Sequence, residues 1–362
     1  MMRLVVPVFL LVVVGGCTGP SPSTPPSADP ALVSAQPLRP RAGHTATLLA
    51  DGRVLLAGGC AVDGCTTSEV EPSSEFYVPG RGFVPGPPMV HPRSSHTATL
   101  LADGRVLIVG GWAREGTTSL TEAEMFDPTT GTFQPAGTLQ GSAILLPDGR
   151  VLIDGGGDAP SNVTVGVQIF DPATGSRTPG PAMPLPHAVP IVLPDGDILI
   201  TGGQDGRQHG LSSTVIYDPG SGDWRPGPEM DTPRFKHAIT MLDGRRILVL
   251  GGTTDDTELL ASTEVLDLAA NKSAPGPVMS APRYKFPTAV ARTTTGRLVV
   301  AGGTQVDVLA PDGQSFVAIT GTGPHRWVAT ATALPDGTVL VVGGYDDRIR
   351  VHPDAHIIEA GP

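Results

Sequence analysis

The chain has 362 residues, of which 40% are hydrophobic, enough for a sizeable core and too many for a disordered chain. Its formal net charge of −11 at pH 7 disfavours nucleic acid as a partner, because binding to phosphates draws on clustered Lys and Arg. With 47 Gly, 38 Pro and 4% aromatic residues, the composition favours many short strands joined by tight turns and offers little surface for stacking sugars or bases.

The N-terminus predicts an exported protein. A short basic start is followed by the apolar run Leu4–Val14 and then by Gly15-Gly16-Cys17. This pattern is typical of a signal peptide over residues 1–16, whose apolar run is too short to span a bilayer as a mature helix. The ending Val14-Gly-Gly-Cys17 resembles the bacterial lipobox, which implies cleavage before Cys17 and a lipid on that residue. An ordinary secretory signal with a chance cysteine is the alternative.

Residues 17–36 follow, and Ser, Thr, Pro, Gly and Ala dominate them up to Pro30. Such a segment cannot bury a core, and it predicts a Ser/Pro-rich tether that starts at the lipidated Cys17. No second long apolar run follows, so we expect the lipid anchor to be the only membrane attachment. The predicted location is a bacterial membrane, facing the periplasm or the cell surface.

Two cysteines, Cys60 and Cys65, lie close together in one loop. In an exported protein, two such cysteines more often pair than stay free. With Gly64 allowing the turn, the sequence predicts a small loop-closing disulfide between them. A zinc site would need further ligands nearby, and the sequence offers none there.

Seven copies of one pattern fill the rest of the chain. The segment 41–59 (RAGHTATLLADGRVLLAGG) recurs almost unchanged as residues 93–111 (RSSHTATLLADGRVLIVGG), and its glycine-rich turn and diglycine return in five further copies. Such recurrence of one segment along the whole chain indicates a repeat architecture. The copies lie near residues 41–92, 93–140, 141–186, 187–233, 234–282, 283–325 and 326–362.

Each copy predicts two hairpins. The Asp-Gly pair suits a type I′ turn, with positive φ at both central positions, between an inner strand such as Thr45–Leu49 and the apolar strand Val54–Ala57. Continuous apolarity predicts burial on both faces, as in strands stacked between neighbouring sheets. A second hairpin follows in most copies, as in residues 126–133 (FDPTTGTF) and 217–224 (YDPGSGDW). Two hairpins give four strands, which make one propeller blade.

This four-strand unit, with its diglycine and its tyrosine-like and tryptophan-like positions, resembles the kelch repeat over residues 41–362. The resemblance implies an all-β fold, a seven-bladed kelch-type β-propeller over residues 37–362 with four antiparallel strands per blade. Copies three, six and seven lack parts of the pattern. Either His356–Glu359 supplies the outer strand of the last blade, or Leu32–Pro37 pairs there; we favour the first.

A binding site is expected on the face that carries the loops after the diglycines. In kelch propellers these loops share a face with the entries to the inner strands. Here they are long and varied, which is typical of loops that carry function on a rigid scaffold. Inner strands line the central channel, so cations at their entries should ring its mouth. The predicted ligand-binding residues are Arg41, His44, Arg93, His96, Arg234, Lys236, His237, Arg283, Lys285, Arg326 and Trp327.

Two interpretations of these residues are open. On an acidic protein, a local group of cations favours an anionic ligand through field focusing. Alternatively, an Arg and a His repeated at one position support the fold by bonding loop carbonyls.

The function that this pattern favours is a non-catalytic binding module, which recognises a partner protein or an anionic saccharide or small acid. No catalytic residue, cofactor or metal is predicted, and the oligomeric state is left open.

One alternative is a sugar-acid epimerase of the kelch type, in which His44, His96 or His237 would move protons. Another is a copper-radical oxidase like galactose oxidase, which would need two tyrosines, two histidines and a cysteine linked to a tyrosine. Of the four tyrosines, Tyr77 and Tyr217 are assigned to outer blade positions. A structural role in the cell envelope is a third class.

Overall fold

The computed structural model describes residues 31–62, 70, 72–114, 118–155, 166–323 and 325–361. The predicted signal peptide, Cys17, Cys65 and the whole loop 157–163 after the third diglycine therefore lie outside the described residues. The described chain is all-β, with strands β1–β30 and no helix. Accordingly, none of these residues lies in a helix that could cross a membrane.

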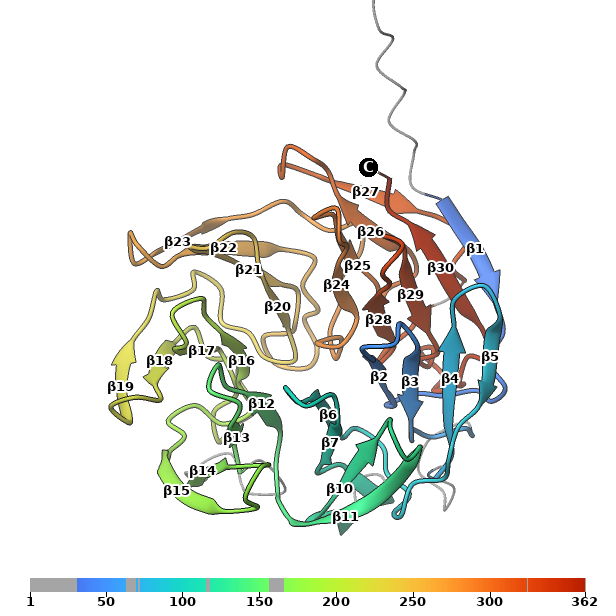
Figure 1. Cartoon of the computed structure of the whole chain (residues 1–362). Coiled ribbons are helices and arrows are strands. Elements are labelled where there is room, and N and C mark those ends of the chain that lie inside the picture. Colours follow the sequence, from blue (N-terminus) through green and yellow to red (C-terminus); the bar gives the residue numbers. More distant parts are fainter. Residues whose placement is uncertain are drawn as a thin grey trace, which may run out of the picture.

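Seven four-stranded antiparallel sheets form the blades of a ring (Figure 1), which confirms the predicted seven-bladed propeller. Blades 1 to 3 consist of β2 (Thr45–Leu48), β3 (Val54–Ala57), β4 (Ser74–Val78) and β5 (Gly82–Pro85); β6 (Thr97–Leu100), β7 (Val106–Val109), β10 (Glu122–Asp127) and β11 (Thr132–Thr138); and β12 (Ala143–Leu145), β13 (Val151–Ile153), β14 (Gly166–Phe170) and β15 (Arg177–Ala182). A short hairpin, β8 (Trp112–Arg114) with β9 (Thr118–Ser119), follows the diglycine of blade 2.

Blades 4 to 7 continue around the ring. They consist of β16 (Val189–Val192), β17 (Ile198–Thr201), β18 (Thr214–Asp218) and β19 (Asp223–Pro226); β20 (Ala238–Met241), β21 (Arg246–Leu250), β22 (Thr263–Asp267) and β23 (Lys272–Pro275); β24 (Val290–Arg292), β25 (Leu298–Val300), β26 (Val306–Leu309) and β27 (Phe316–Ile319); and β28 (Thr330–Ala333), β29 (Val339–Val342), β30 (Ala355–Glu359) and β1 (Ala31–Ala35).

The core lies between the blades. Every residue of β3, β7, β17 and β29 is buried, as the continuous apolar runs predict. One hydrophobic cluster joins Leu55 of blade 1 to Val106 of blade 2, and the next joins Leu107 of blade 2 to Val151 of blade 3. Each second strand therefore packs against both neighbouring sheets, and this packing holds the ring together.

The first hairpin of each blade differs from the predicted type I′ turn. In blade 1, Gly52 has φ 84°, whereas Asp51 is not among the residues with positive φ. The Gly52 amide donates to the Leu49 carbonyl (3.0 Å) and the Leu49 amide to that of Arg53 (2.8 Å), as in a type I turn followed by a left-handed glycine. The Asp51 carboxylate accepts from the Arg53 amide (3.0 Å), which favours this longer loop.

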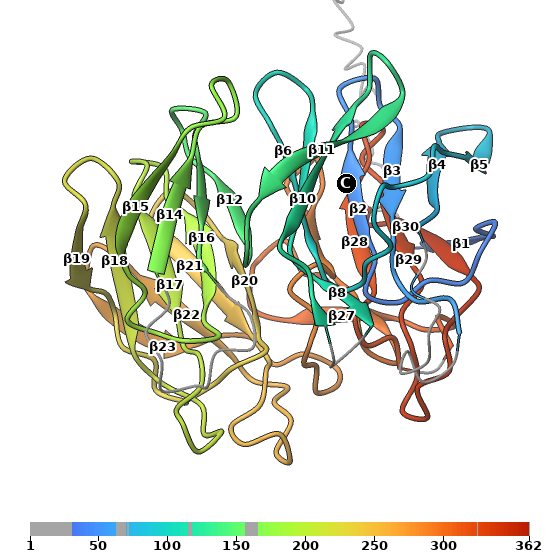
Figure 2. The same cartoon turned by 90° about the horizontal axis from the view of Figure 1, so that it is seen from below.

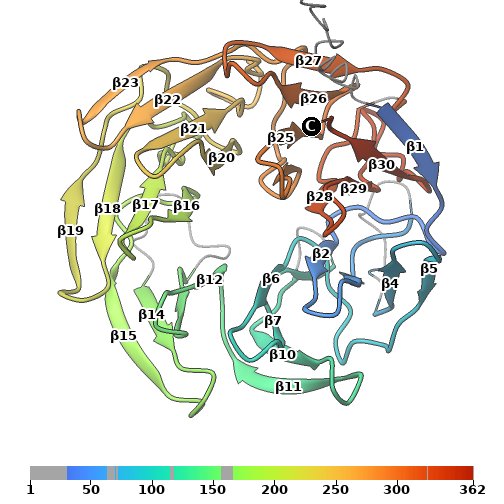
Figure 3. The same cartoon turned by 45° about the horizontal axis from the view of Figure 1, so that its top comes forward.

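The ring closes differently from our preferred alternative. The outer strand of blade 7 is β1, which pairs antiparallel with β30 from Ala31↔Glu359 to Ala35↔Ala355 (Figures 1 and 3). Because β30 is only the third strand of this blade, the prediction that His356–Glu359 forms the outer strand was wrong. Residues 31–35 also fall within the predicted tether 17–36, so the propeller extends at least to Ala31 instead of starting at residue 37.

The two faces of the ring are unequal (Figure 2). The short first hairpins point to one face, and longer connections that follow the diglycines, such as Gln204–Ser213 and Thr253–Ser262, reach the other. This second surface is the loop face referred to below.

Candidate functional site

Five of the predicted site residues are arginines, and all five are enclosed within the blades. At most 2% of each is exposed. Each guanidinium pairs with a carboxylate of its own blade: Arg41–Glu75 (2.8 Å), Arg93–Glu124 (2.8 Å), Arg234–Glu264 (2.5 Å), Arg283–Asp307 (2.7 Å) and Arg326–Asp354 (2.6 Å). Most also donate to the carbonyl of a diglycine, as Arg93 does to Gly110 (3.0 Å).

Blades 3 and 4 lack both members of this pair. Leu139 and Leu185 take the place of the arginine, and both are buried. At the register position where Glu124 faces Ile108 in blade 2, Gln168 faces Ile153 in blade 3 and Val215 faces Ile200 in blade 4. Since the arginine and the carboxylate are either both present or both absent in a blade, the role of each is to neutralise the buried charge of the other. The prediction that the arginines ring the channel mouth as ligand-binding groups was therefore wrong, and the structural alternative explains them.

The three predicted histidines are also interior. His44, His96 and His237 are at most 6% exposed, and each makes a hydrogen bond through Nε2 to a threonine of the preceding blade: Thr330 (3.0 Å), Thr45 (2.9 Å) and Thr201 (2.8 Å). Burial, and then the charge of Arg41, lowers the pKa of His44 to about 3. Burial, and then Arg234, lowers the pKa of His237 to about 3, and burial lowers the pKa of His96 as well. These neutral rings join neighbouring blades.

We expect these histidines to make the fold acid-sensitive. A pKa that is lower in the folded than in the unfolded state means that the unfolded chain binds more protons, so stability falls as pH decreases from about 6.5 to about 3. Each such histidine contributes at most about 1.4 kcal/mol per pH unit within this window. Urea unfolding across the window should give a shallower pH dependence for His237→Gln than for the native chain. An unchanged slope would contradict a neutral, buried His237.

A different set of residues surrounds the channel at the loop face. It occupies one repeat position, two residues after the arginine, and contributes one residue per blade: Gly43, Ser95, Gly141, His187, Lys236, Lys285 and Val328, hereafter the inner ring. All seven have positive φ, between 52° and 112°. The five that are not glycine are among nine such residues in the part of the chain that the structure describes.

Backbone hydrogen bonds join successive members of the inner ring across blade boundaries. The amide of Ser95 donates to the carbonyl of Gly43 (2.7 Å), Gly43 to Val328 (3.3 Å), Val328 to Lys285 (3.2 Å) and Lys285 to Lys236 (2.9 Å). These bonds run through five blades and hold each residue in the left-handed conformation.

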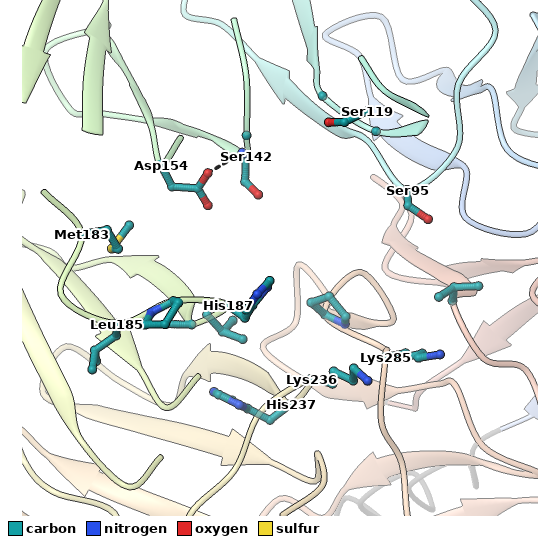
Figure 4. A pocket seen from close by; sticks show the side chains of 18 of the residues that line it. Ser95, Ser119, Ser142, Asp154, Met183, Leu185, His187, Lys236, His237 and Lys285 are labelled. Atoms are coloured by element: carbon teal, nitrogen blue, oxygen red, sulfur yellow. Dashed lines mark hydrogen bonds between the residues drawn. The ribbon is translucent and has the colours of Figure 1, made fainter. Parts of the chain in front are cut away.

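A pocket of about 500 Å³ opens at this end of the channel (Figure 4). Every inner-ring residue except Gly43 lines it, together with residues of blades 2 to 4 that include Trp112, Asp154 and Leu185. Its volume lies in the range of small-molecule sites. Lys236 and Lys285 lie side by side on one wall, whereas Asp154 and Ser142 lie on the wall across the opening (Figure 4).

The charges of the pocket are unevenly compensated. Lys236 Nζ pairs with the Asp256 carboxylate at 2.5 and 2.7 Å. Lys285 Nζ lies 5.2 Å from the centroid of the Tyr284 ring, and no carboxylate of the described residues forms an ion pair with it. Lys285 is therefore the cation that a ligand can reach without displacing an acid.

Trp327, another predicted site residue, is 4% exposed. Its indole NH donates to the Asp347 carboxylate (2.9 Å), and the imidazole of His325 stacks on it with centroids 4.6 Å apart. Tyr284 packs edge-on against the same indole. Trp327 thus supports the wall behind Lys285 and is covered by its neighbours.

Of the predicted set, Lys236, Lys285 and His237 line the pocket, and His237 does so as a buried ring. The sequence prediction missed Ser95, His187, Val328 and Asp154. The signal for Ser95 was variability, because Gly43, Ser95 and Lys236 differ although all three copies have an Arg two residues before and a His one residue after this position; the copies that contain His187 and Val328 lack that His. Asp154 interrupts an otherwise apolar strand end.

Two of the four tyrosines, and the buried histidines, are placed away from any copper site of the radical-oxidase kind. Tyr77 and Tyr217 lie on β4 and β18, the third strands of their blades, and the buried histidines use Nε2 for threonines. Within the described ranges, no three His, Cys, Asp or Glu side chains form a metal-binding group. Cys60 is buried, and its predicted disulfide stays a prediction because Cys65 lies outside the described residues.

Comparison with known proteins places the fold. The kelch motif family matches residues 93–140 and 187–231, which correspond to blades 2 and 4. A fungal alcohol oxidase of the AA5 family, solved in complex with copper, superposes with a TM-score of 0.71 over 91% of this chain and 75% of that chain, at 18% identity. Comparison with curated protein sequences gives no match. Kelch motifs in two blades of a closed seven-bladed ring support a kelch-repeat propeller.

Proposed function

We propose that this protein is a binding propeller that takes an anionic saccharide or small acid in the pocket at the inner ring, with Lys285 and Lys236 as the anion-binding groups. As a further part of the proposal, it is exported and held at a bacterial membrane through Cys17. A partner protein on the loop face is the other class of ligand that the varied loops allow.

The observation that carries the proposal is the residue type at the inner ring. A left-handed backbone is free for glycine but costs other residues of order 1 kcal/mol or more, and a β-branched residue such as Val328 is a rare occupant. The fold accepts glycine here, as Gly43 and Gly141 demonstrate, yet five blades carry larger side chains that face the pocket. Residues with a strained backbone that gather around a cavity are typical of functional sites.

The two lysines at the pocket favour a ligand with negative charge. The chain has only three, and two of them, Lys236 and Lys285, lie next to each other on the pocket wall. On a chain with net charge −11, such a local pair attracts anions.

The alternative of a sugar-acid epimerase loses its proposed proton carriers. His44, His96 and His237 have neutral, enclosed rings whose Nε2 atoms are engaged. Incubating any ligand found below with the protein and analysing it for a new product distinguishes an enzyme from a binder.

We expect Lys285→Met to weaken uronic acid binding about tenfold or more, because a hydrogen bond to a charged group contributes about 1.5–3 kcal/mol. Isothermal titration with glucuronate and galacturonate measures this, and the affinity should fall with added salt. Lys272→Met is the matched control, since Lys272 is exposed on the outer strand β23. Equal loss in both variants, or equal binding of the neutral parent sugars, would contradict the proposal.

A further inference from the structure

One wall of the pocket carries a carboxylate at a position where five of the other six blades have an apolar residue. Asp154 occupies the position directly before the diglycine of blade 3. The other blades have Ala57, Val109, Thr201, Leu250, Ala301 and Val342 there, all buried. Since the position closes a core strand, a charge there gains nothing for hydrophobic packing.

Asp154 is held in place at the pocket. Its Oδ1 accepts a hydrogen bond from the Ser142 amide (2.7 Å), and its own amide donates to the Ser142 carbonyl (3.1 Å). Asp154 lines the pocket, and in Figure 4 its carboxylate points into the opening from the wall across from Lys236 and Lys285. The hydrogen bond fixes the direction in which the negative charge faces.

The pocket therefore presents opposite charges from facing walls. A ligand with one anionic group at the lysines leaves Asp154 facing its far end, and a second anionic group there would be repelled. A ligand whose far end carries a protonated amine is attracted at both ends.

We propose that the ligand of this pocket is zwitterionic, an amino acid or amino-bearing sugar acid whose carboxylate binds Lys285 and Lys236 and whose ammonium binds Asp154. This inference rests on the proposed anion site and specifies what occupies its other end. Because Lys236 already pairs with Asp256, Lys285 is the main contact of the ligand's carboxylate.

Three matched series of probes test the inference by isothermal titration: unbranched ω-amino acids of four, six and eight carbons, the monocarboxylic acids of the same lengths, and the corresponding dicarboxylic acids. We expect one length of ω-amino acid to bind at least tenfold more tightly than its monocarboxylic counterpart, with the dicarboxylic acid weakest. In Asp154→Asn, which retains an oxygen for the Ser142 amide, this preference should disappear.

Asp256→Asn is the control for loss of a nearby carboxylate. Freeing Lys236 should strengthen all three series together and leave the preference for the amine intact. Equal binding of amino and plain acids, or a preference that survives Asp154→Asn, would overturn the zwitterion while leaving the anion site supported by its dependence on Lys285. Failure of every probe to bind would overturn both.

Discussion

Arg93→Met is expected to lower the free energy of unfolding by about 3–5 kcal/mol, because it leaves the enclosed Glu124 carboxylate without the buried cation that pairs with it. Arg93 also donates to the carbonyls of Gly110 (3.0 Å) and Glu122 (2.7 Å), and these acceptors lose their donor in the variant. Urea unfolding at neutral pH measures the loss. The effect should be of similar size at the equivalent pair Arg234–Glu264.

The chain itself supplies the matched control for this prediction. Blade 3 replaces the pair by Leu139 with Gln168, so Arg93→Leu combined with Glu124→Gln reproduces in blade 2 what blade 3 already tolerates. The double variant should be more stable than the single one. Arg105→Met, at the exposed pair Asp103–Arg105, should cost no more than about 1 kcal/mol. A double variant less stable than Arg93→Met would show that the arginine acts through contacts other than its carboxylate.

Removal of β1 should open the ring. A chain that begins at residue 37 lacks the strand that pairs with β30 over Ala31–Ala35 and loses the packing of Leu32 against the core beside Ile358. At roughly 1 kcal/mol for each hydrogen bond and about 2 kcal/mol for the leucine, the loss is on the order of 5 kcal/mol. Thermal unfolding should show a markedly lower Tm than for a chain that begins at residue 31.

A milder variant keeps this prediction testable if the shortened chain fails to fold. Leu32→Ala removes the buried contact alone and should lower the unfolding free energy by about 2 kcal/mol, whereas Val33→Ala, at a side chain that is 51% exposed, should have little effect. Equal stability of chains beginning at 31 and at 37 would contradict closure by β1.

The repeated hairpins made the fold predictable. The diglycines and the apolar strands, such as Val54–Ala57, occur in the sequence in the order in which the blades use them, and local pattern and global packing agree. Closure was less predictable, because β1 has no repeat signature and lies 324 positions before its partner strand. Leu32 and Val33 set Ala31–Ala35 apart from the Ser/Pro-rich residues before it, but nothing local in this segment identifies the strand with which it pairs.

The site was only partly predictable, for a physical reason. Repetition marks what most blades use for stability, and Arg41, Arg93 and Arg234 recur at one position because each stabilises its own blade. A ligand contacts the ring once and asymmetrically, so its contacts differ from blade to blade. Lys285, His187 and Asp154 are departures from the pattern, and the backbone conformation that sets the first two apart is invisible in the sequence.

Because β1 pairs with β30, the ring can close only when both residues 31–35 and residues 355–359 are present. During synthesis, residues 31–35 emerge early and have no strand to pair with until residues 355–359 have followed. Any product cut short before Ala355 leaves the edge of β29 uncovered, and an unpaired edge strand recruits other chains or proteases. We therefore expect truncated copies to aggregate or to be degraded through their exposed strand edges, whereas chains with a closed ring are not.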